Sequence, residues 1–317
     1  MMKILILGFS SIAKRRVIPA LEAIIGIESI DVACQRENIE IATSKPGKIF
    51  RSYQEALESS DADIVYISLV NSAHCQWVEQ ALIKGYHVVV DKPAFLSIAD
   101  AETMAVIAEK QGKALIEANV FSFHPQVEEC KKHFNDLNSE ISRVYACFSF
   151  PPLDASNFRY SKEMGGGALY DLGPYALATG EVFFGQEPEC IQASINRQSD
   201  KLDYSFSVLM SYSGGRSLVG HFGFDTSYQN RVSLISKDIC VELDRVFTTP
   251  PDMSNTLKVQ KGGKSNEYKI KAFDSFVEFF KVIISDIKSA NYQSHTWRLL
   301  QAAKLQQRLI QSAWNFA

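Results

Sequence analysis

Short apolar runs alternate with a segment of helical spacing in the first part of the chain. Four such runs predict strands: Lys3–Leu7, Ile30–Cys34, Asp63–Leu69 and His87–Val90. Between the last two, the stretch Asn71–Lys84 places its apolar residues at the spacing of a helix. Strands that alternate with helices form parallel sheets with right-handed crossovers. We therefore predict an α/β domain with a doubly wound parallel sheet over residues 1–118.

Beyond residue 118 the pattern changes to successive strands joined by short turns. The strand candidates are Arg143–Phe150, Cys190–Arg197, Tyr204–Tyr212, Ser217–Asp225, Arg231–Ile235 and Ile239–Leu243. This succession predicts a second, α+β domain over residues 119–317 with an open, mainly antiparallel sheet. Helical patterns at Phe273–Ile287 and from Trp297 onward are available to cover one face. A partner subunit would cover the other face, so we expect a homodimer or a homotetramer.

The first strand runs directly into a turn rich in small residues. A dinucleotide-binding turn needs a sharp bend, a close backbone approach to the pyrophosphate, and a small residue where the helix packs on the strand. Gly8 and Ala13 meet the first and third needs, and Ser10 stands where glycine is usual. The position of this turn, after a strand and at a helix N-terminus, favours a phosphate-binding turn over an ordinary strand-to-helix connection.

The second strand ends in Gln35 and Arg36, where an acidic side chain would bind the ribose hydroxyls of NAD. A guanidinium at this point can pair with a 2′-phosphate. We therefore expect NADP(H) as the preferred cofactor, with NAD(H) possible. The alternative is that Arg36 is a solvated loop charge.

A lone lysine follows the fourth of these strands. The carboxyl ends of parallel strands lie at one edge of the sheet, where ligands bind. Both the turn Ser68–His74 and the tripeptide Asp91-Lys92-Pro93 fall at this edge. Lys92 is therefore predicted to face a ligand.

Composition and charge narrow the class of protein. The chain has 317 residues, of which 46% are hydrophobic, so it can bury a sizeable core. Its formal charge of −3 and pI of about 6.1 provide no positive electrostatic field that would attract nucleic acid or a membrane. The six cysteines contain no C-x-x-C pair, so neither a metal site nor a disulfide framework is indicated. These features are typical of a soluble cytoplasmic enzyme.

A glycine-rich segment supplies the second set of polar residues. Gly165-Gly166-Gly167 lets the backbone bend sharply and approach another group. If Asp171 caps a helix, or the helix starts slightly earlier, Asp171 and Tyr175 lie on one face, four residues apart. The alternative is a glycine loop with an N-cap aspartate and a core tyrosine.

Taken together, these segments resemble the Gfo/Idh/MocA oxidoreductase family almost from end to end, which implies an N-terminal Rossmann domain followed by a C-terminal domain with an open sheet. The matching residues are Ser52-Tyr53, Ala56-Leu57, Asn71, His74, Asp91-Lys92-Pro93, Phe123-His124-Pro125 and the three glycines. Tyr175 stands where many members have histidine. Tyrosine there, and a pattern similar to Asn157-Phe158-Arg159, are found in the glucose-fructose oxidoreductase and dihydrodiol dehydrogenase branch. Ser10, Val70 and Ser122 depart from the usual pattern, which puts the cofactor position and the substrate pocket in doubt.

The resemblance implies hydride transfer at a secondary alcohol or ketone of a sugar, a sugar derivative or a nucleotide-sugar. Tyr175 would exchange a proton with the substrate oxygen, with Lys92 stabilising its ionised form and Asp171 either orienting both groups or holding another hydroxyl. Lys92 as the proton donor stays an alternative. The substrate would contact Lys92, Arg159, Asp171 and Tyr175. The alternative role of Arg159 is a salt bridge that braces the glycine loop. Rival functions are a redox-neutral cleavage of a glycoside or C–O bond and a non-catalytic NAD(P)-binding sensor.

The residues expected to contact the cofactor all follow predicted strands or open the first helix. They are Gly8, Ser10, Ser11, Ile12, Ala13, Gln35, Arg36, Ser68, Leu69, Asn71, His74, Asp91, Lys92 and Asn119. We interpret His74 as a hydrogen-bond partner within the cofactor loop and His124 as mainly structural. Neither histidine has partners at metal-ligand spacing.

Overall fold

The computed structural model describes residues 1–36, 40–199 and 202–315. The chain divides into two compact units. The first unit holds Met1–Asn119 and Phe276–Ala303, and the second holds Val120–Ser275 and Lys304–Ala317. We had expected all residues after 118 to form one domain, whereas Phe276–Ala303 lies in the first unit.

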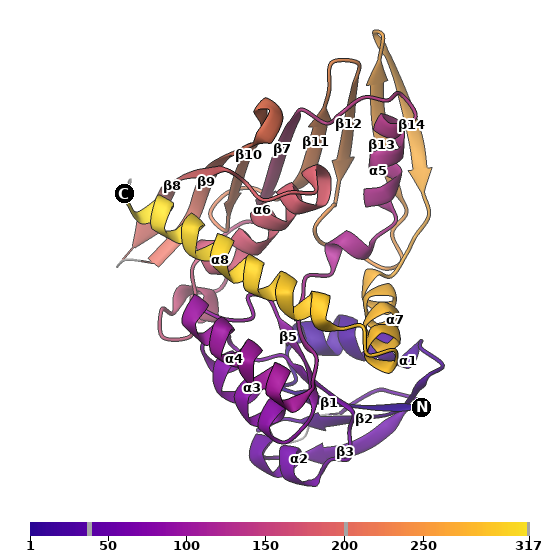
Figure 1. Cartoon of the computed structure of the whole chain (residues 1–317), viewed down its shortest axis with the longest axis vertical. Helices are drawn as coiled ribbons and strands as arrows, with labels where there is room; N and C mark the ends of the chain where they lie inside the picture. Colours follow the sequence, from indigo (N-terminus) through magenta and orange to yellow (C-terminus); the bar gives the residue numbers. More distant parts are fainter. Residues whose placement is uncertain (37–39, 200–201, 316–317) are drawn as a thin grey trace. The chain divides into compact units, whose positions relative to one another are not determined.

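The first unit is built on a parallel sheet with the strand order β3-β2-β1-β4-β5-β6 (Figure 1). Its strands are β1 (Met2–Leu7), β2 (Ile27–Ala33), β3 (Pro46–Phe50), β4 (Ile64–Ile67), β5 (His87–Asp91) and β6 (Leu115–Ala118). This order confirms the predicted Rossmann fold. The direction of winding reverses between β1 and β4, which is where such folds bind ligands.

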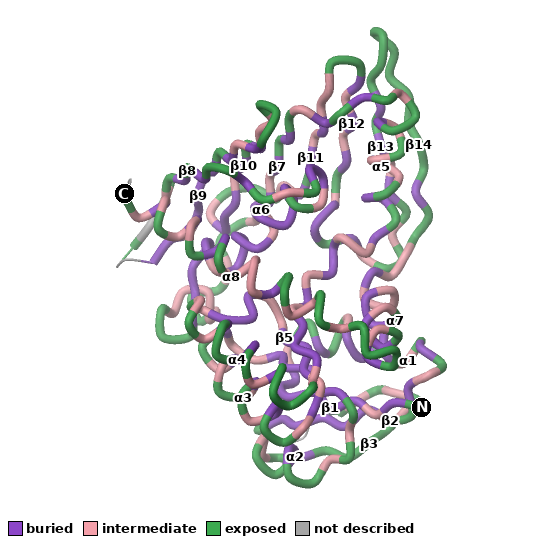
Figure 2. The backbone as a smooth tube through the Cα atoms, viewed as in Figure 1, coloured by how far each residue is buried: buried purple, intermediate pink, exposed green. Residues whose placement is uncertain are grey.

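Helices cover both faces of this sheet, which is why its central strands are mainly apolar. One face packs against α2 (Tyr53–Ser59), α3 (His74–Ile83) and α4 (Ile98–Gln111). The short helices η1 (Ala13–Val17) and α1 (Ile18–Glu22) follow β1, and α7 (Ser275–Lys288) packs on the other face, where the rings of Tyr66 and Phe280 lie 5.7 Å apart. Figure 2 shows the resulting run of buried strands.

The predicted role of the Phe273–Ile287 helix is therefore wrong. We expected it to cover the second sheet, but α7 packs on the first, because Tyr66 and its neighbours need an apolar cover on their side. Helix α8 (Gln293–Asn315) starts in the first unit and ends in the second. Only its later turns join the second core, through Leu305, Leu309 and Ala313.

The second unit contains a sheet with the order β14-β13-β12-β11-β7-β10-β9-β8. Its strands are β7 (Arg143–Ser149), β8 (Cys190–Ser199), β9 (Leu202–Tyr212), β10 (Arg216–Gly223), β11 (Gln229–Ile235), β12 (Ile239–Asp244), β13 (Asn255–Lys261) and β14 (Lys264–Ile270). All pairs are antiparallel except β7 with β10. This confirms the predicted open, mainly antiparallel sheet. Helices α5 (Gln126–Asn135) and α6 (Ala168–Phe184) contribute to the core beneath it (Figure 1).

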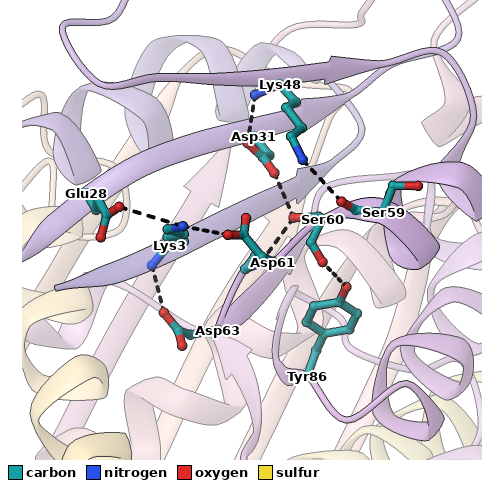
Figure 3. Close-up of polar contacts among 10 residues, drawn as sticks. Lys3, Glu28, Asp31, Lys48, Ser59, Ser60, Asp61, Asp63 and Tyr86 are labelled. Atoms are coloured by element: carbon teal, nitrogen blue, oxygen red, sulfur yellow. Dashed lines mark hydrogen bonds and ion pairs between the residues drawn. The ribbon is translucent and has the colours of Figure 1, made fainter.

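Polar side chains gather near the amino ends of the strands in the first unit (Figure 3). The Lys3 ammonium lies 2.5 Å from the Asp61 carboxylate, and the Lys3 backbone N–H donates to Asp63. Asp31 accepts from the Lys48 backbone N–H and from the Ser60 hydroxyl, each at 2.7 Å. These contacts tie the loop after α2 to strands β1 and β2.

In the described part of the chain, no helix is long and apolar enough to cross a bilayer.

Candidate active site

Gly8 ends the first strand of the parallel sheet in a conformation that favours glycine, with φ of +93°. A Cβ atom on this residue would lie 2.2 Å from the Ser68 carbonyl oxygen. The close approach lets the turns after β1 and β4 meet at the point where the sheet reverses its winding. Ala13 is fully buried, as expected for the residue where the helix packs on the sheet.

Ser10 has a defined role in this turn although glycine is usual at its position. Its hydroxyl oxygen accepts a hydrogen bond from the Ala13 N–H at 3.0 Å, which caps the first helix. The same oxygen lies 2.7 Å from the Ser68 hydroxyl, and Ser68 donates to Asp91 at 2.6 Å. A hydrogen-bonded chain therefore links the turn after β1 to the end of β5.

The loop that carries Lys92 is anchored from several elements. The Tyr66 hydroxyl donates to the second carboxylate oxygen of Asp91. The His74 ring, on α3, lies 2.9 Å from the Pro93 carbonyl oxygen, and the Ala94 N–H donates to Glu117 on β6 at 2.8 Å. These contacts fix the backbone on both sides of Lys92.

Burial shifts the pKa values of two ionisable groups beneath this loop. It lowers the pKa of the His74 imidazole and raises the pKa of the Asp91 carboxyl. The other ring nitrogen of His74 lies 3.2 Å from the Leu69 carbonyl oxygen. His74 thus contacts the backbone of two neighbouring turns, which accords with the hydrogen-bonding role that the sequence suggested.

The predicted cofactor residues of the first unit lie at or after the carboxyl ends of strands β1, β2, β4, β5 and β6. Their exposure differs. Ser68, Asn71 and His74 are buried, whereas Ser11, Gln35 and Arg36 are exposed. The buried group holds the turns in place, and the exposed group leaves polar atoms open to a ligand.

Arg36 lies across the end of the first strand. Its guanidinium donates to the Phe9 carbonyl oxygen and lies 6.0 Å from the centre of the Phe9 ring. Arg51, directly after β3, donates to the Arg36 carbonyl oxygen at 2.6 Å. Two guanidinium groups therefore lie at the carboxyl ends of the neighbouring strands β2 and β3.

The glycine-rich segment of the second unit packs against the backbone near Arg159. A Cβ on Gly166 would lie 2.5 Å from the Arg159 carbonyl oxygen, and the Gly167 N–H donates to that oxygen at 3.0 Å. Arg159 in turn makes two bonds to the Asp171 carboxylate, at 2.6 and 3.1 Å. This forked pair has the geometry of a strong ion pair.

Helix α6 begins at Ala168, so the expectation that Asp171 caps it is wrong and the alternative of an earlier start is right. The cap is supplied from β9, because the Asp203 carboxylate accepts from the Leu169 N–H at 2.5 Å. Burial raises the pKa of Asp203 to about 6. Asp171 lies in the first turn, one helical turn before Tyr175.

Tyr175 packs among aromatic rings of the second unit. Its ring centre lies 5.2 Å from Phe148, 5.5 Å from Phe247 and 6.0 Å from Phe121. The ring is only partly buried. Tyr175 therefore packs against the core, as the alternative interpretation proposed, and also lies next to the Arg159–Asp171 pair. Within this unit, Arg159, Asp171 and Tyr175 are brought together.

Three positioning residues escaped the sequence analysis. Tyr66 and Glu117 are polar groups within apolar strands, and such groups need a partner when buried, which was a usable signal. Asp203 had no such signal, because its partner is the start of a helix distant in sequence. Over the described residues, no group of His, Cys, Asp or Glu could hold a metal ion.

Two family models match the chain. Residues 2–119 match an oxidoreductase family described as having an NAD-binding Rossmann fold, and residues 139–239 match the GFO/IDH/MocA C-terminal domain. Both matches agree with the two-part architecture described above.

Relatives with assigned activities match most of the chain. A dTDP-3,4-didehydro-2,6-dideoxy-alpha-D-glucose 3-reductase of Streptomyces antibioticus is 30% identical over 77% of this chain and 76% of its own. A D-xylose 1-dehydrogenase (NADP(+)) of Haloferax volcanii is 26% identical over 82% of this chain and 81% of its own. A crystal structure of a 3-ketoreductase from Actinomadura kijaniata, in complex with NADP and TDP-benzene, superimposes with a TM-score of 0.90 at 26% identity and covers 98% of both chains.

Proposed function

Because the chain belongs to the Gfo/Idh/MocA oxidoreductase family, we propose that it transfers a hydride between NADP(H) and a ketone or secondary alcohol of a sugar. The observation that carries the proposal is the anchored Lys92 loop at the carboxyl edge of the parallel sheet, where this fold binds its ligand. The matches to the two family models confirm the family resemblance seen in the sequence.

The residues at this edge fit a dinucleotide phosphate. Ser11 and Ile12 open the first helix, and the first N–H groups of a helix have no intrahelical partner, so they suit the pyrophosphate. The exposed Arg36 guanidinium suits a 2′-phosphate, with Arg51 beside it. The Asn119 side-chain oxygen has no hydrogen-bond partner among the described residues and suits the carboxamide of the nicotinamide.

The cofactor, when bound, supplies or accepts the hydride. Lys92 and Tyr175 would act on the oxygen at the reacting carbon, with the Tyr175 hydroxyl exchanging the proton and the Lys92 ammonium favouring its ionised form. Asp171 is already committed to Arg159 by two bonds, so we assign that pair to holding a neighbouring substrate hydroxyl and orienting Tyr175. Lys92 as the immediate proton donor remains an alternative mechanism.

For the substrate we propose either a keto sugar carried on a nucleotide, as the names of the Streptomyces and Actinomadura relatives indicate, or an aldose, as for the Haloferax relative. Arg159 would contact its polar groups. The first assay follows NADPH with a panel of sugars. Nucleotide-linked keto sugars are tested for oxidation of NADPH, and free aldoses are tested for reduction of NADP+. Turnover without net change in NADPH would indicate redox-neutral cleavage, and binding without turnover would indicate a sensor.

The catalytic roles are tested by Lys92→Ala and Tyr175→Phe. Each variant should bind NADPH almost normally and lose about 10²–10⁴ in turnover, the usual contribution of a positioned acid or base. Since the two residues act as one unit, the double variant should be scarcely worse than Lys92→Ala. Unchanged turnover in Tyr175→Phe would return that residue to a core role and leave Lys92 as the donor.

The cofactor choice is tested by titration. NADPH should bind more tightly than NADH, by about tenfold for each 1.4 kcal/mol that the 2′-phosphate contact contributes. Arg36→Ala should remove most of this difference and leave NADH binding unchanged. Equal affinity of the wild-type protein for both cofactors would contradict the assignment.

We further propose that the outer face of the second sheet binds a second copy of the chain. Tyr145, Val219 and Leu209 pair across three neighbouring strands and are each roughly half exposed, which makes an apolar row on the outside of the sheet. Light scattering should give a dimer or tetramer, and Val219→Lys with Leu209→Lys should give a monomer. The matched control is Ile25→Lys, an exposed apolar residue of the other unit, which should not change the assembly.

A further inference from the structure

We propose that Ser10 is a positioning residue for Lys92, which rests on the proposed function above. Its hydroxyl couples the cofactor turn, through Ser68 and Asp91, to the loop that carries Lys92. The sequence pattern treats Ser10 as a departure from the glycine of a dinucleotide turn. The hydrogen bonds give it a role that glycine could not fill.

The direction of each bond follows from counting protons. Ser68 has one hydroxyl proton and donates it to Asp91 at 2.6 Å. The contact of 2.7 Å between the two serine hydroxyls must then be donated by Ser10, whose own oxygen accepts from the Ala13 N–H. The chain of donors therefore runs in one direction, from the first helix to the Asp91 carboxylate.

Ser68 makes this coupling sensitive to change. Ser68 is only 2% exposed. If the Ser10 donor were lost, water could therefore not replace it at the Ser68 oxygen. The Ser68 hydroxyl would then turn to find another donor, which would weaken its own bond to the Asp91 carboxylate. Because Lys92 follows Asp91 directly in the chain, a weaker hold on Asp91 would let the lysine shift, and small displacements of a catalytic group cost turnover.

The bond to Ala13 raises a competing explanation, namely that Ser10 serves as a helix cap and nothing more. Ser97 provides the matched control, because its hydroxyl caps α4 by accepting from the Asp100 N–H at 3.1 Å. Ser97→Gly removes a cap of the same kind elsewhere in the same unit. An effect that is specific to Ser10 must then come from the bond to Ser68.

The experiment compares Ser10→Gly, Ser10→Thr, Ser68→Ala, the double variant Ser10→Gly with Ser68→Ala, and Ser97→Gly. Ser10→Gly should bind NADPH as well as the wild type or better, since glycine permits closer approach, while kcat falls about tenfold. Ser10→Thr keeps the hydroxyl and should restore most of kcat. Ser97→Gly should change neither NADPH affinity nor kcat.

Double-mutant analysis supplies a readout that needs no substrate. The changes in the free energy of unfolding for Ser10→Gly and Ser68→Ala should not add, since either substitution alone breaks the chain of hydrogen bonds. Additive changes, or an unaltered kcat in Ser10→Gly, would overturn the proposal. Absence of turnover in the wild type with every sugar tested would instead count against the proposed function, with the unfolding measurements still reporting on the hydrogen-bonded chain.

Discussion

The two ends of the parallel sheet use the same kinds of polar residue in different ways. At the amino ends, Lys3 pairs with Asp61 and Glu28 at the surface, with 67% and 45% of those acidic side chains exposed. At the carboxyl ends, Asp91 is only partly exposed and is held by the neutral hydroxyls of Tyr66 and Ser68. The Lys3 cluster thus pairs opposite charges in water, whereas the Asp91 carboxylate is held by neutral hydroxyl donors.

This difference separates stability from function. Exposed ion pairs contribute little to folding, and no ligand is expected where helices lead into a parallel sheet. At the opposite end the hydrogen bonds converge on the backbone around Lys92, so a change there alters the position of a reactive group. Substitutions at the amino ends should therefore change the free energy of unfolding alone, and those at the carboxyl ends should change turnover as well.

The largest expected effect contrasts two glycines at opposite ends of the sheet. Gly8→Ala would force a positive φ on alanine and bring its Cβ to 2.2 Å from the Ser68 oxygen, so we expect a loss of more than about 3 kcal/mol or failure to fold. Gly26→Ala, just before β2, meets nothing closer than 3.8 Å and should change stability by less than about 1 kcal/mol. Urea unfolding compares the two, and equal losses would remove the contrast.

A smaller effect is expected from Asp31→Asn at the amino-end network. Both carboxylate oxygens accept hydrogen bonds, from Lys48 and Ser60, and an amide can accept only one of them. We expect a loss of about 1–3 kcal/mol in the free energy of unfolding, with kcat and KM unchanged. A change in kcat would show that the two ends are not independent.

The smallest effect concerns pH. Burial lowers the pKa of His87, at the start of β5, from 6.5 to about 4, so between these values the unfolded chain binds a proton that the folded one does not. The stability of the wild type should accordingly fall as the pH drops from about 6.5 toward 4. In His87→Gln, whose amide oxygen can still accept from the Ala114 N–H, this fall should be shallower. Identical pH profiles of thermal unfolding would contradict the assignment.

Much of the parallel unit could be predicted from the sequence because its signals are local. Apolar runs, the bend at Gly8 and the lysine after β5 each depend on a few adjacent residues. The edge strand β3 was missed, since four of its five residues are exposed and it lacks an apolar run. β14 was missed for the same reason, with Lys264 and its successors exposed up to Ile270.

The polar site was less predictable because its partners are distant in sequence. Ser10 and Ser68 are far apart in the chain, and Asp203 caps a helix that begins at Ala168. No residue near Asp203 in the sequence indicates that role. The type of residue at Arg159, Asp171 and Tyr175 suggested chemistry, but their pairing depends on how the glycine segment folds back on Arg159.

The strand β14 also has a consequence for how the protein behaves at high concentration. It forms one border of the second sheet, so its outer backbone groups resemble an open template for another chain. Lys264 and Lys269 lie on this border, and its residues up to Lys269 are exposed and largely polar. Such charges oppose the edge-to-edge stacking that leads to fibrils. Growth of the sheet by a foreign strand is thereby discouraged even in concentrated protein solution.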